Sequence, residues 1–268
     1  LPILTRLKVL GYRPHVIQFT WGPEEKLLKC KLLCDAEQIP CRVVRVFRFA
    51  GSAGSLISAV LGCSIIYSAI RKWRINVIMP RSLMPALSII CLGRLTAARI
   101  VFDADGFAAD ERADFQGLPK ESLAYRTLKL IERTMIRRAD SVMVRTSRAR
   151  EILQADCQVD MAKFYLVTNG RDPGPYCSSF SPRRGKSLRI CYAGSLGPQY
   201  QLAQMFTLAR CLHEAIPSTT FEILTCDLSL AADERSKAGL AGAIWITMRS
   251  LLPAQIPLAL KSCDLAFS

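Results

Sequence analysis

Aromatic side chains, histidines and closely spaced cysteine pairs are all scarce in this sequence of 268 residues. Phe, Trp and Tyr make up 8% of it, which argues against the aromatic-rich sheet surfaces that bind single-stranded RNA. Only two histidines occur, and no two cysteines have the two-residue separation of common zinc sites. The sequence therefore predicts no metal site.

Charged residues are also modest in number, at 22%, whereas hydrophobic residues reach 50%. This balance excludes a disordered chain and provides enough apolar surface for two folded domains. The net charge is +14, of which residues 1–182 carry +11 and residues 183–268 carry +3. A basic first half indicates an anionic partner, but no nucleic-acid-binding module is recognisable, so we expect no nucleic acid among the partners.

The eleven cysteines do not have the spacing of a disulfide framework. Most lie inside apolar runs, as Cys63, Cys91 and Cys191 do, which is typical of small buried side chains in a reducing compartment. The closest pair, Cys30 and Cys34, has helical i,i+4 spacing. We therefore expect reduced thiols and a cytoplasmic location.

Short apolar runs alternate with helical patterns along the chain, which predicts parallel sheets covered by helices. A helix is expected at 1–10, another at 119–138 with Pro119 in its first turn, and a third at 199–214. Strands are expected at 15–19, 42–47, 76–79, 99–102, 141–144, 164–167, 188–193, 220–225, 243–247 and 264–267.

One uncharged segment, residues 49–70, has the length of a membrane span. It contains five serines and three glycines, and it lies between two expected strands. A buried crossover helix is therefore favoured over a helix on the membrane surface or a true span.

A composition break at residues 172–187, with three prolines, two glycines and four serines, predicts a linker. It separates a domain at 1–180 from a second at 181–268, and both are expected to be doubly wound parallel sheets. The first residue is Leu1 rather than Met, and residues 264–268 have the pattern of a buried strand. We therefore expect a fragment of a longer protein with an incomplete second domain.

Three strand-to-loop junctions carry candidate functional residues. The loop after residues 188–193 contains Gly194, Ser195 and Gly197, which either cradle a phosphate or form a tight turn before a helix. The strand at 99–102 is followed by an acidic run, residues 103–114, which either binds hydroxyl groups and acts as a base or is a solvated loop. Arg81 follows a third strand, where it either holds a phosphate or lies on the surface.

Taken in order, these motifs resemble glycosyltransferase family 4. The matching blocks are LKVLGYRPHVIQF at 7–19, IVFDADGFAADERAD at 100–114, ERTMIRRADSVMVRTSRARE at 132–151, VTNGRD at 167–172, RICYAGSLGPQY at 189–200 and the segment 253–264. The RICYAGSLGPQY block is similar to the glycine loop of one subgroup of that family.

This resemblance implies a GT-B-like fold with two Rossmann-like domains and a retaining, metal-independent transfer from a nucleotide-sugar donor. No cofactor is implied, and the acceptor would be a cell-envelope, lipid-linked or polysaccharide glycan. The basic first domain adds a possible peripheral contact with the inner face of an anionic membrane. By position, the donor residues would be Gly194, Ser195, Gly197, Tyr200 and Arg249, with Arg249 in a turn beside the base; the catalytic acceptor-side pair would be Asp103 and Asp105, accompanied by Arg81, Gly106 and Glu111.

Some residues depart from the family pattern. Asp105 stands where the subgroup has arginine, and Thr168 stands where proline is expected. Glu214 and Glu222 match the spacing of the family's glutamate pair, but a helix end and a strand are the wrong context for it. The sequence ends before the matching region, so we expect this fragment alone to be inactive. A non-catalytic remnant that binds sugar nucleotides or glycans is the alternative function.

Overall fold

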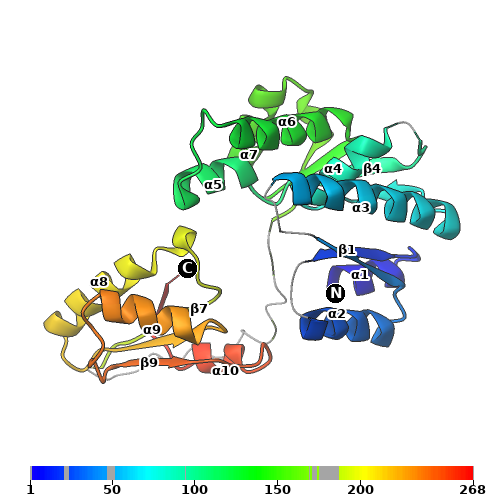
Figure 1. Cartoon of the computed structure of the whole chain (residues 1–268). Coiled ribbons are helices and arrows are strands. Elements are labelled where there is room, and N and C mark those ends of the chain that lie inside the picture. Colours follow the sequence, from blue (N-terminus) through cyan, green and yellow to red (C-terminus); the bar gives the residue numbers. More distant parts are fainter. Residues whose placement is uncertain are drawn as a thin grey trace. The chain divides into compact units, whose positions relative to one another are not determined.

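The computed structural model describes residues 2–20, 24–46, 52–93, 95–168, 170, 174 and 187–267. It divides into two compact units, Leu1–Asn169 and Gly170–Ser268 (Figure 1). The expected boundary at residue 180 comes later, inside a linker that lies almost wholly outside the described residues. Each unit is an α/β structure with parallel strands.

The first unit forms all six strands expected in it, each within a residue or two of the predicted bounds over the described residues. Its elements in chain order are α1 (Pro2–Val9), β1 (Val16–Thr20), α2 (Glu24–Ala36), β2 (Cys41–Arg45), α3 (Ser52–Trp73), β3 (Val77–Ile78), α4 (Leu83–Leu92), β4 (Arg99–Asp103), α5 (Ala108–Gln116), α6 (Leu123–Arg138), β5 (Ser141–Val144), α7 (Ser147–Cys157), the 3₁₀ turn η1 (Met161–Lys163) and β6 (Phe164–Leu166).

These six strands form two parallel sheets, β1-β2 and β3-β4-β5-β6, where the pattern predicts one. The two-residue strand β3 offers few backbone groups for a further neighbour. Strand β1 instead packs through Phe19 against helices: a Cβ on Gly62 of α3 would lie 2.5 Å from the Phe19 ring. The β1-β2 pair also contacts the end of α3, where Trp73 stacks on His15 and lies 5.2 Å from the Arg42 guanidinium. The pair is therefore attached to the unit through side-chain packing on α3.

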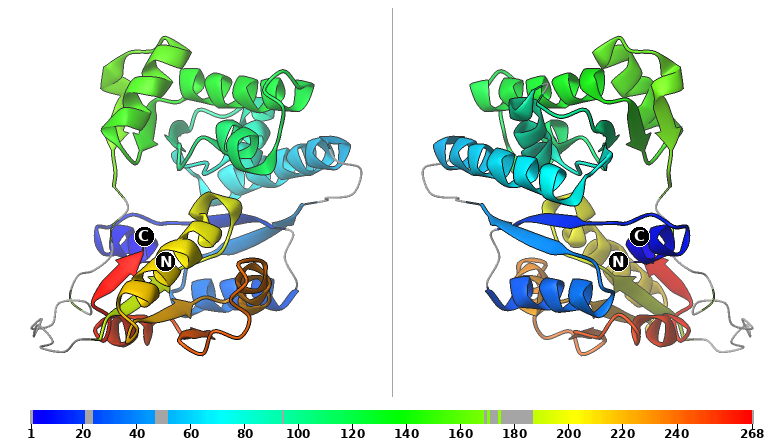
Figure 2. Two further views of the ribbon diagram at one scale, coloured as in Figure 1. Left: turned by 90° about the vertical axis from the view of Figure 1, so that its left-hand side faces the viewer. Right: turned by 90° about the vertical axis from the view of Figure 1, so that its right-hand side faces the viewer.

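The apolar segment expected at 49–70 forms helix α3, cyan in Figure 2, over its described part. One face of this helix is buried through Ser58, Ala59, Ile66 and Ala69, as expected of a crossover helix. No helix in the described part of the chain has the length and apolar character needed to cross a bilayer.

Helix α6 begins at Leu123, so the prediction of Pro119 in its first turn is wrong. The Ser122 hydroxyl accepts a hydrogen bond from the Tyr125 amide and caps the helix. Pro119 lies in the preceding turn, where its carbonyl accepts from the Ser122 amide. The helix begins after Ser122 because the serine hydroxyl satisfies an amide of the first turn that would otherwise have no partner.

The second unit contains the four predicted strands in the order β10-β7-β8-β9. One face of this sheet packs on α8 through Phe206 and Phe221, whose rings lie 5.9 Å apart. The other face packs on α10 through Ala259. Its elements are β7 (Arg189–Ala193), η2 (Pro198–Tyr200), α8 (Leu202–Ala215), β8 (Thr220–Leu224), α9 (Leu228–Lys237), β9 (Ile246–Arg249), α10 (Ile256–Leu260) and β10 (Leu265–Phe267).

Candidate functional site

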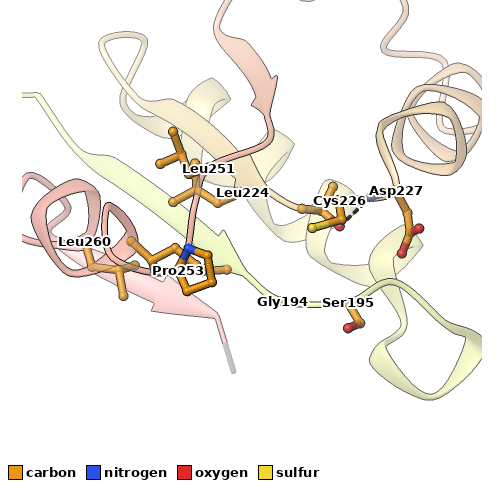
Figure 3. Close-up of a pocket in the computed structure, with 11 residues that line it drawn as sticks. Gly194, Ser195, Leu224, Cys226, Asp227, Leu251, Pro253 and Leu260 are labelled. Atoms are coloured by element: carbon orange, nitrogen blue, oxygen red, sulfur yellow. Dashed lines mark hydrogen bonds between the residues drawn. The ribbon is translucent and has the colours of Figure 1, made fainter. Parts of the chain in front are cut away.

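A pocket of about 710 Å³ lies at the carboxyl ends of β7 and β8 in the second unit. Ligands of open parallel sheets bind at this edge, because the loops that follow the strands converge there. Figure 3 shows its two principal loops, one with Gly194 and Ser195 after β7 and one with Cys226 and Asp227 after β8. Leu224, Leu251, Pro253 and Leu260 contribute apolar lining.

The conformation of the loop after β7 depends on a buried tyrosine. The Tyr192 hydroxyl donates a 2.6 Å hydrogen bond to the Ser195 carbonyl. A Cβ on Gly194 would lie 2.8 Å from that hydroxyl oxygen, so only glycine fits without displacing the ring. Burial raises the pKa of Tyr192, which keeps the hydroxyl protonated and donating.

The amides of this loop differ in their availability to a ligand. Gly194 donates its N–H to the Leu224 carbonyl at 3.1 Å, so this amide extends the sheet. The amides of Ser195, Leu196 and Gly197 have no partner within the described residues. These three amides are therefore the ones available to contact the donor. Gly194 contributes through its small size, which leaves room for the Tyr192 hydroxyl.

Three of the predicted donor residues lie outside the pocket lining, namely Gly197 on the same loop, Tyr200 and Arg249. Tyr200 belongs to η2, and its ring centroid is 6.4 Å from that of Tyr192. Arg249 ends strand β9 rather than lying in a turn, so that local prediction is wrong; the residue continues the parallel pairing with Leu224. Its Nε donates to Glu222 at 2.6 Å.

Four residues on the β8 side were not predicted from the sequence. They are Leu224, Thr225, Cys226 and Asp227, which line the pocket because β8 pairs in parallel with β7. Asp227 lies next to the first residue of α9, and its amide donates a 3.3 Å hydrogen bond to the Thr225 hydroxyl oxygen. The predicted strand at 220–225 could have indicated these residues, because adjacent parallel strands end at the same edge of a sheet.

The acidic run of the first unit meets arginines at the carboxyl edge of the β3-β4-β5-β6 sheet. Asp103, 3% exposed at the end of β4, accepts a 2.7 Å bond from Nη2 of Arg145, which follows β5. Arg145 also donates to Asp105 at 2.9 Å and to the Val167 carbonyl after β6 at 3.0 Å. Arg81, after β3, donates to Asp105 as well. One guanidinium thus connects the ends of three strands.

These ion pairs change the chemistry of the carboxylates. Burial raises the pKa of Asp105, but hydrogen bonds from Arg81 and Arg145 outweigh burial and hold it below its usual range. An anion held in this way is a weak base and a good acceptor of hydrogen bonds. Gly106 and Glu111 lie beside it, and a Cβ on Gly106 would collide with the Glu111 carboxylate.

The residues predicted on the acceptor side therefore lie close together in the first unit; they are Arg81, Asp103, Asp105, Gly106 and Glu111. Arg145 was not predicted. It follows Asp105 by 40 residues, and no local pattern indicates that pairing. The catalytic assignment of Asp103 and Asp105 stays a prediction.

No protein-family model matches the chain, and no curated protein sequence matches it. Solved structures do. A glycosyltransferase from Rickettsia africae matches with a TM-score of 0.63 and 14% identity, over 98% of this chain and 66% of that one. A protein described as a UDP-N-acetylglucosamine 2-epimerase from Listeria monocytogenes matches at 0.59 and 14%, over 94% and 65%. A sucrose-phosphate synthase from Thermosynechococcus elongatus matches at 0.60 and 10%, over 95% and 75%.

The chain spans less than two thirds of the length of the Rickettsia and Listeria proteins. At 10–14% identity, these likenesses show the fold. They confirm the predicted fold class, which is GT-B-like with two Rossmann-like parallel-sheet units.

Proposed function

We propose that this chain is part of a glycosyltransferase and binds the diphosphate of a nucleotide-sugar donor at the loop after β7. The observation that carries the proposal is the pocket at the ends of β7 and β8, lined by Ser195, whose amide and those of the next two loop residues have no partner among the described residues. Its volume of about 710 Å³ is within the range of small-molecule sites. Sugar transfer accords with the name of the Rickettsia protein, and a UDP-sugar ligand accords with that of the Listeria protein.

The chemistry of the loop suits a diphosphate leaving group. Negative charge grows on the diphosphate as the sugar bond breaks, and fixed backbone N–H donors stabilise that charge without reorganising. Neither group of metal-ligating side chains found among the described residues lines the pocket, so we assign this role to the amides of Ser195, Leu196 and Gly197. The proposed transfer is retaining and metal-independent, as the resemblance to family 4 implies.

The acidic and basic side chains of the first unit are proposed to bind the acceptor glycan. Asp105 retains 33% side-chain exposure, enough to accept a hydrogen bond from an acceptor hydroxyl. Asp103, at 5% side-chain exposure, positions Arg145 rather than touching the acceptor. The arginine-bound carboxylates are suited to orienting a hydroxyl group, and orientation contributes much of the rate enhancement in group transfer.

The test is hydrogen–deuterium exchange of the purified chain with and without UDP. We expect slower exchange at the amides of Ser195, Leu196 and Gly197, and unchanged exchange at Gly194, whose amide is already bonded to Leu224. UDP-sugar turnover assays then separate an enzyme from a sugar-nucleotide-binding remnant. Absence of UDP binding, or protection confined to the first unit, would contradict the proposed site.

We further propose that the first unit contacts an anionic membrane through α1 and α2. Leu28 and Leu32 of α2 are 57% and 58% exposed, Ile3 of α1 is 69% exposed, and the last turn of α1 contains the cations Arg6 and Lys8. Exposed apolar side chains with neighbouring cations suit shallow insertion between acidic headgroups.

In flotation, we expect the chain to bind vesicles containing phosphatidylserine at low salt and to be released at high salt, because salt screens the attraction. Leu32→Glu should weaken binding. Leu208→Glu, on a half-exposed position of α8, is the matched control. Equal binding to neutral vesicles, or binding that survives high salt and carbonate, would argue against this surface.

A further inference from the structure

Three thiols meet where helix α2 packs beside strand β2. Cys30 and Cys34 lie one turn apart on α2, and Cys41 is the first residue of β2. Their sulfur atoms all lie within 4.8 Å of one another. Cys34 is 2% exposed, and the other two are partly exposed. The sequence indicated only the pair Cys30 and Cys34, because Cys41 comes close to them only when β2 packs beside α2.

The backbone between the helix and the strand fixes this arrangement. The Ile39 amide donates to the Cys34 carbonyl at 2.8 Å, and the Val16 amide of β1 donates to the Pro40 carbonyl at 2.8 Å. Ile39 is 1% exposed and anchors the turn. The start of β2 is therefore held against the last turns of α2, so the three sulfurs need no large movement to share one ligand.

From this geometry we propose that Cys30, Cys34 and Cys41 bind one thiophilic divalent cation, Zn²⁺, with a water molecule as its fourth ligand. Zn–S bonds of about 2.3 Å place sulfurs about 3.8 Å apart in a tetrahedral site. Sulfurs already within 4.8 Å reach that separation through small side-chain rotations. Thiolates are the ligands that select soft ions of this kind over Mg²⁺ or Ca²⁺.

The ion would have a structural use at this place. Strands β1 and β2 form a two-stranded sheet of their own, and such small sheets need additional packing to be stable. A cation bound by two helix residues and one strand residue would tie α2 to β2, and its binding free energy would add to the stability of the folded state.

A second group, Cys191, Glu222 and Cys263, is a weaker candidate. Its carboxylate already binds Arg249 at 2.6 Å, and Cys191 is fully buried. Hydrogen bonding from Cys191 lowers the pKa of Cys263 to about 7, which makes Cys263 a useful reactive thiol for comparison.

The first experiment titrates the reduced, chelator-treated chain with Zn²⁺ against a chromophoric competitor, and with Co²⁺ as a spectroscopic probe. We expect one ion per chain and a thiolate-to-cobalt charge-transfer band. Cys30→Ser or Cys41→Ser should weaken Zn²⁺ binding by more than about 100-fold, the upper end for changes to outer-shell partners alone. Cys211→Ser, an exposed position on α8, and Cys263→Ser should leave it unchanged.

The second experiment uses the unsubstituted chain, so that it does not depend on the folding of a variant. Alkylation followed by peptide mapping should show Zn²⁺ protecting Cys30 and Cys41 while Cys263 remains reactive. Absence of Zn²⁺ binding, protection at Cys191 and Cys263 instead, or full affinity in Cys30→Ser would overturn the proposal. In that case the three thiols serve only as packing.

Discussion

Replacing Gly194 with valine is expected to lower the affinity of the chain for UDP by more than tenfold, or about 1.4 kcal/mol. The first added carbon would lie 2.8 Å from the Tyr192 hydroxyl oxygen and 3.1 Å from its ring carbon Cζ. Tyr192 is 3% exposed, so its ring cannot move away without disturbing the core. The loop must shift instead, which breaks the hydrogen bond to Ser195 and misplaces the amides proposed to hold the diphosphate.

Isothermal titration with UDP measures this effect, and Gly242→Val is the matched control. Gly242 is exposed, and no atom lies within 4 Å of the position of an added Cβ. Gly194→Ala with and without Tyr192→Phe tests the steric cause, because Tyr192→Phe removes both the colliding oxygen and the bond to Ser195, so the alanine should cost less affinity in that background than in the unsubstituted chain. Unchanged UDP affinity in Gly194→Val would mean that the loop is only a tight turn between β7 and η2.

The fold was largely predictable because its signals are local. Apolar runs bounded by turns placed ten strands, and the structure forms all ten close to the predicted bounds. The start of α6 was misplaced because Ser122 is a better cap than the turn at Pro119. The division into a β1-β2 pair and a separate sheet was also missed, and so was the packing of Phe19 against Gly62 that attaches the pair to α3. Neither residue indicates that contact in the sequence.

The functional residues also divide into those with a local sequence signal, which were predicted, and those brought together by strand pairing, which were missed. Gly194 and Ser195 were predicted because glycine after a strand is a local signal. Cys226 and Asp227 were missed because they reach the pocket through the pairing of two strands. Arg145 was missed for the same reason, since its contact with Asp103 joins the ends of β4 and β5.

Replacing Arg145 with methionine is expected to cost about 3 kcal/mol in the free energy of unfolding, because it leaves a buried carboxylate without its main partner. The Arg145 and Asp103 side chains are 16% and 5% exposed and lie 2.7 Å apart. Arg81 offers little compensation, since its Nε is 3.9 Å from Asp103 and its side chain is 60% exposed. Urea unfolding at neutral pH measures the loss.

Two matched variants separate the buried pair from a general effect of removing arginine. Arg148→Ala breaks an exposed ion pair with Glu151 and should cost no more than about 0.5 kcal/mol. Adding Asp103→Asn to Arg145→Met should restore part of the lost stability, because the uncompensated charge is removed. A double variant no more stable than Arg145→Met would show that the carboxylate charge is not the cause.

The pH dependence of the same variant has a definite sign. Because the pKa of Asp105 is lower in the folded chain than in the unfolded chain, its contribution is present above the unfolded value and is lost as the pH falls through the folded value. Arg145→Met removes one of the two guanidinium donors to Asp105, so the folded pKa rises. Acid unfolding followed by circular dichroism should therefore begin at a higher pH in Arg145→Met than in the unsubstituted chain. Superimposable acid transitions would mean that Arg81 alone sets the charge state of Asp105.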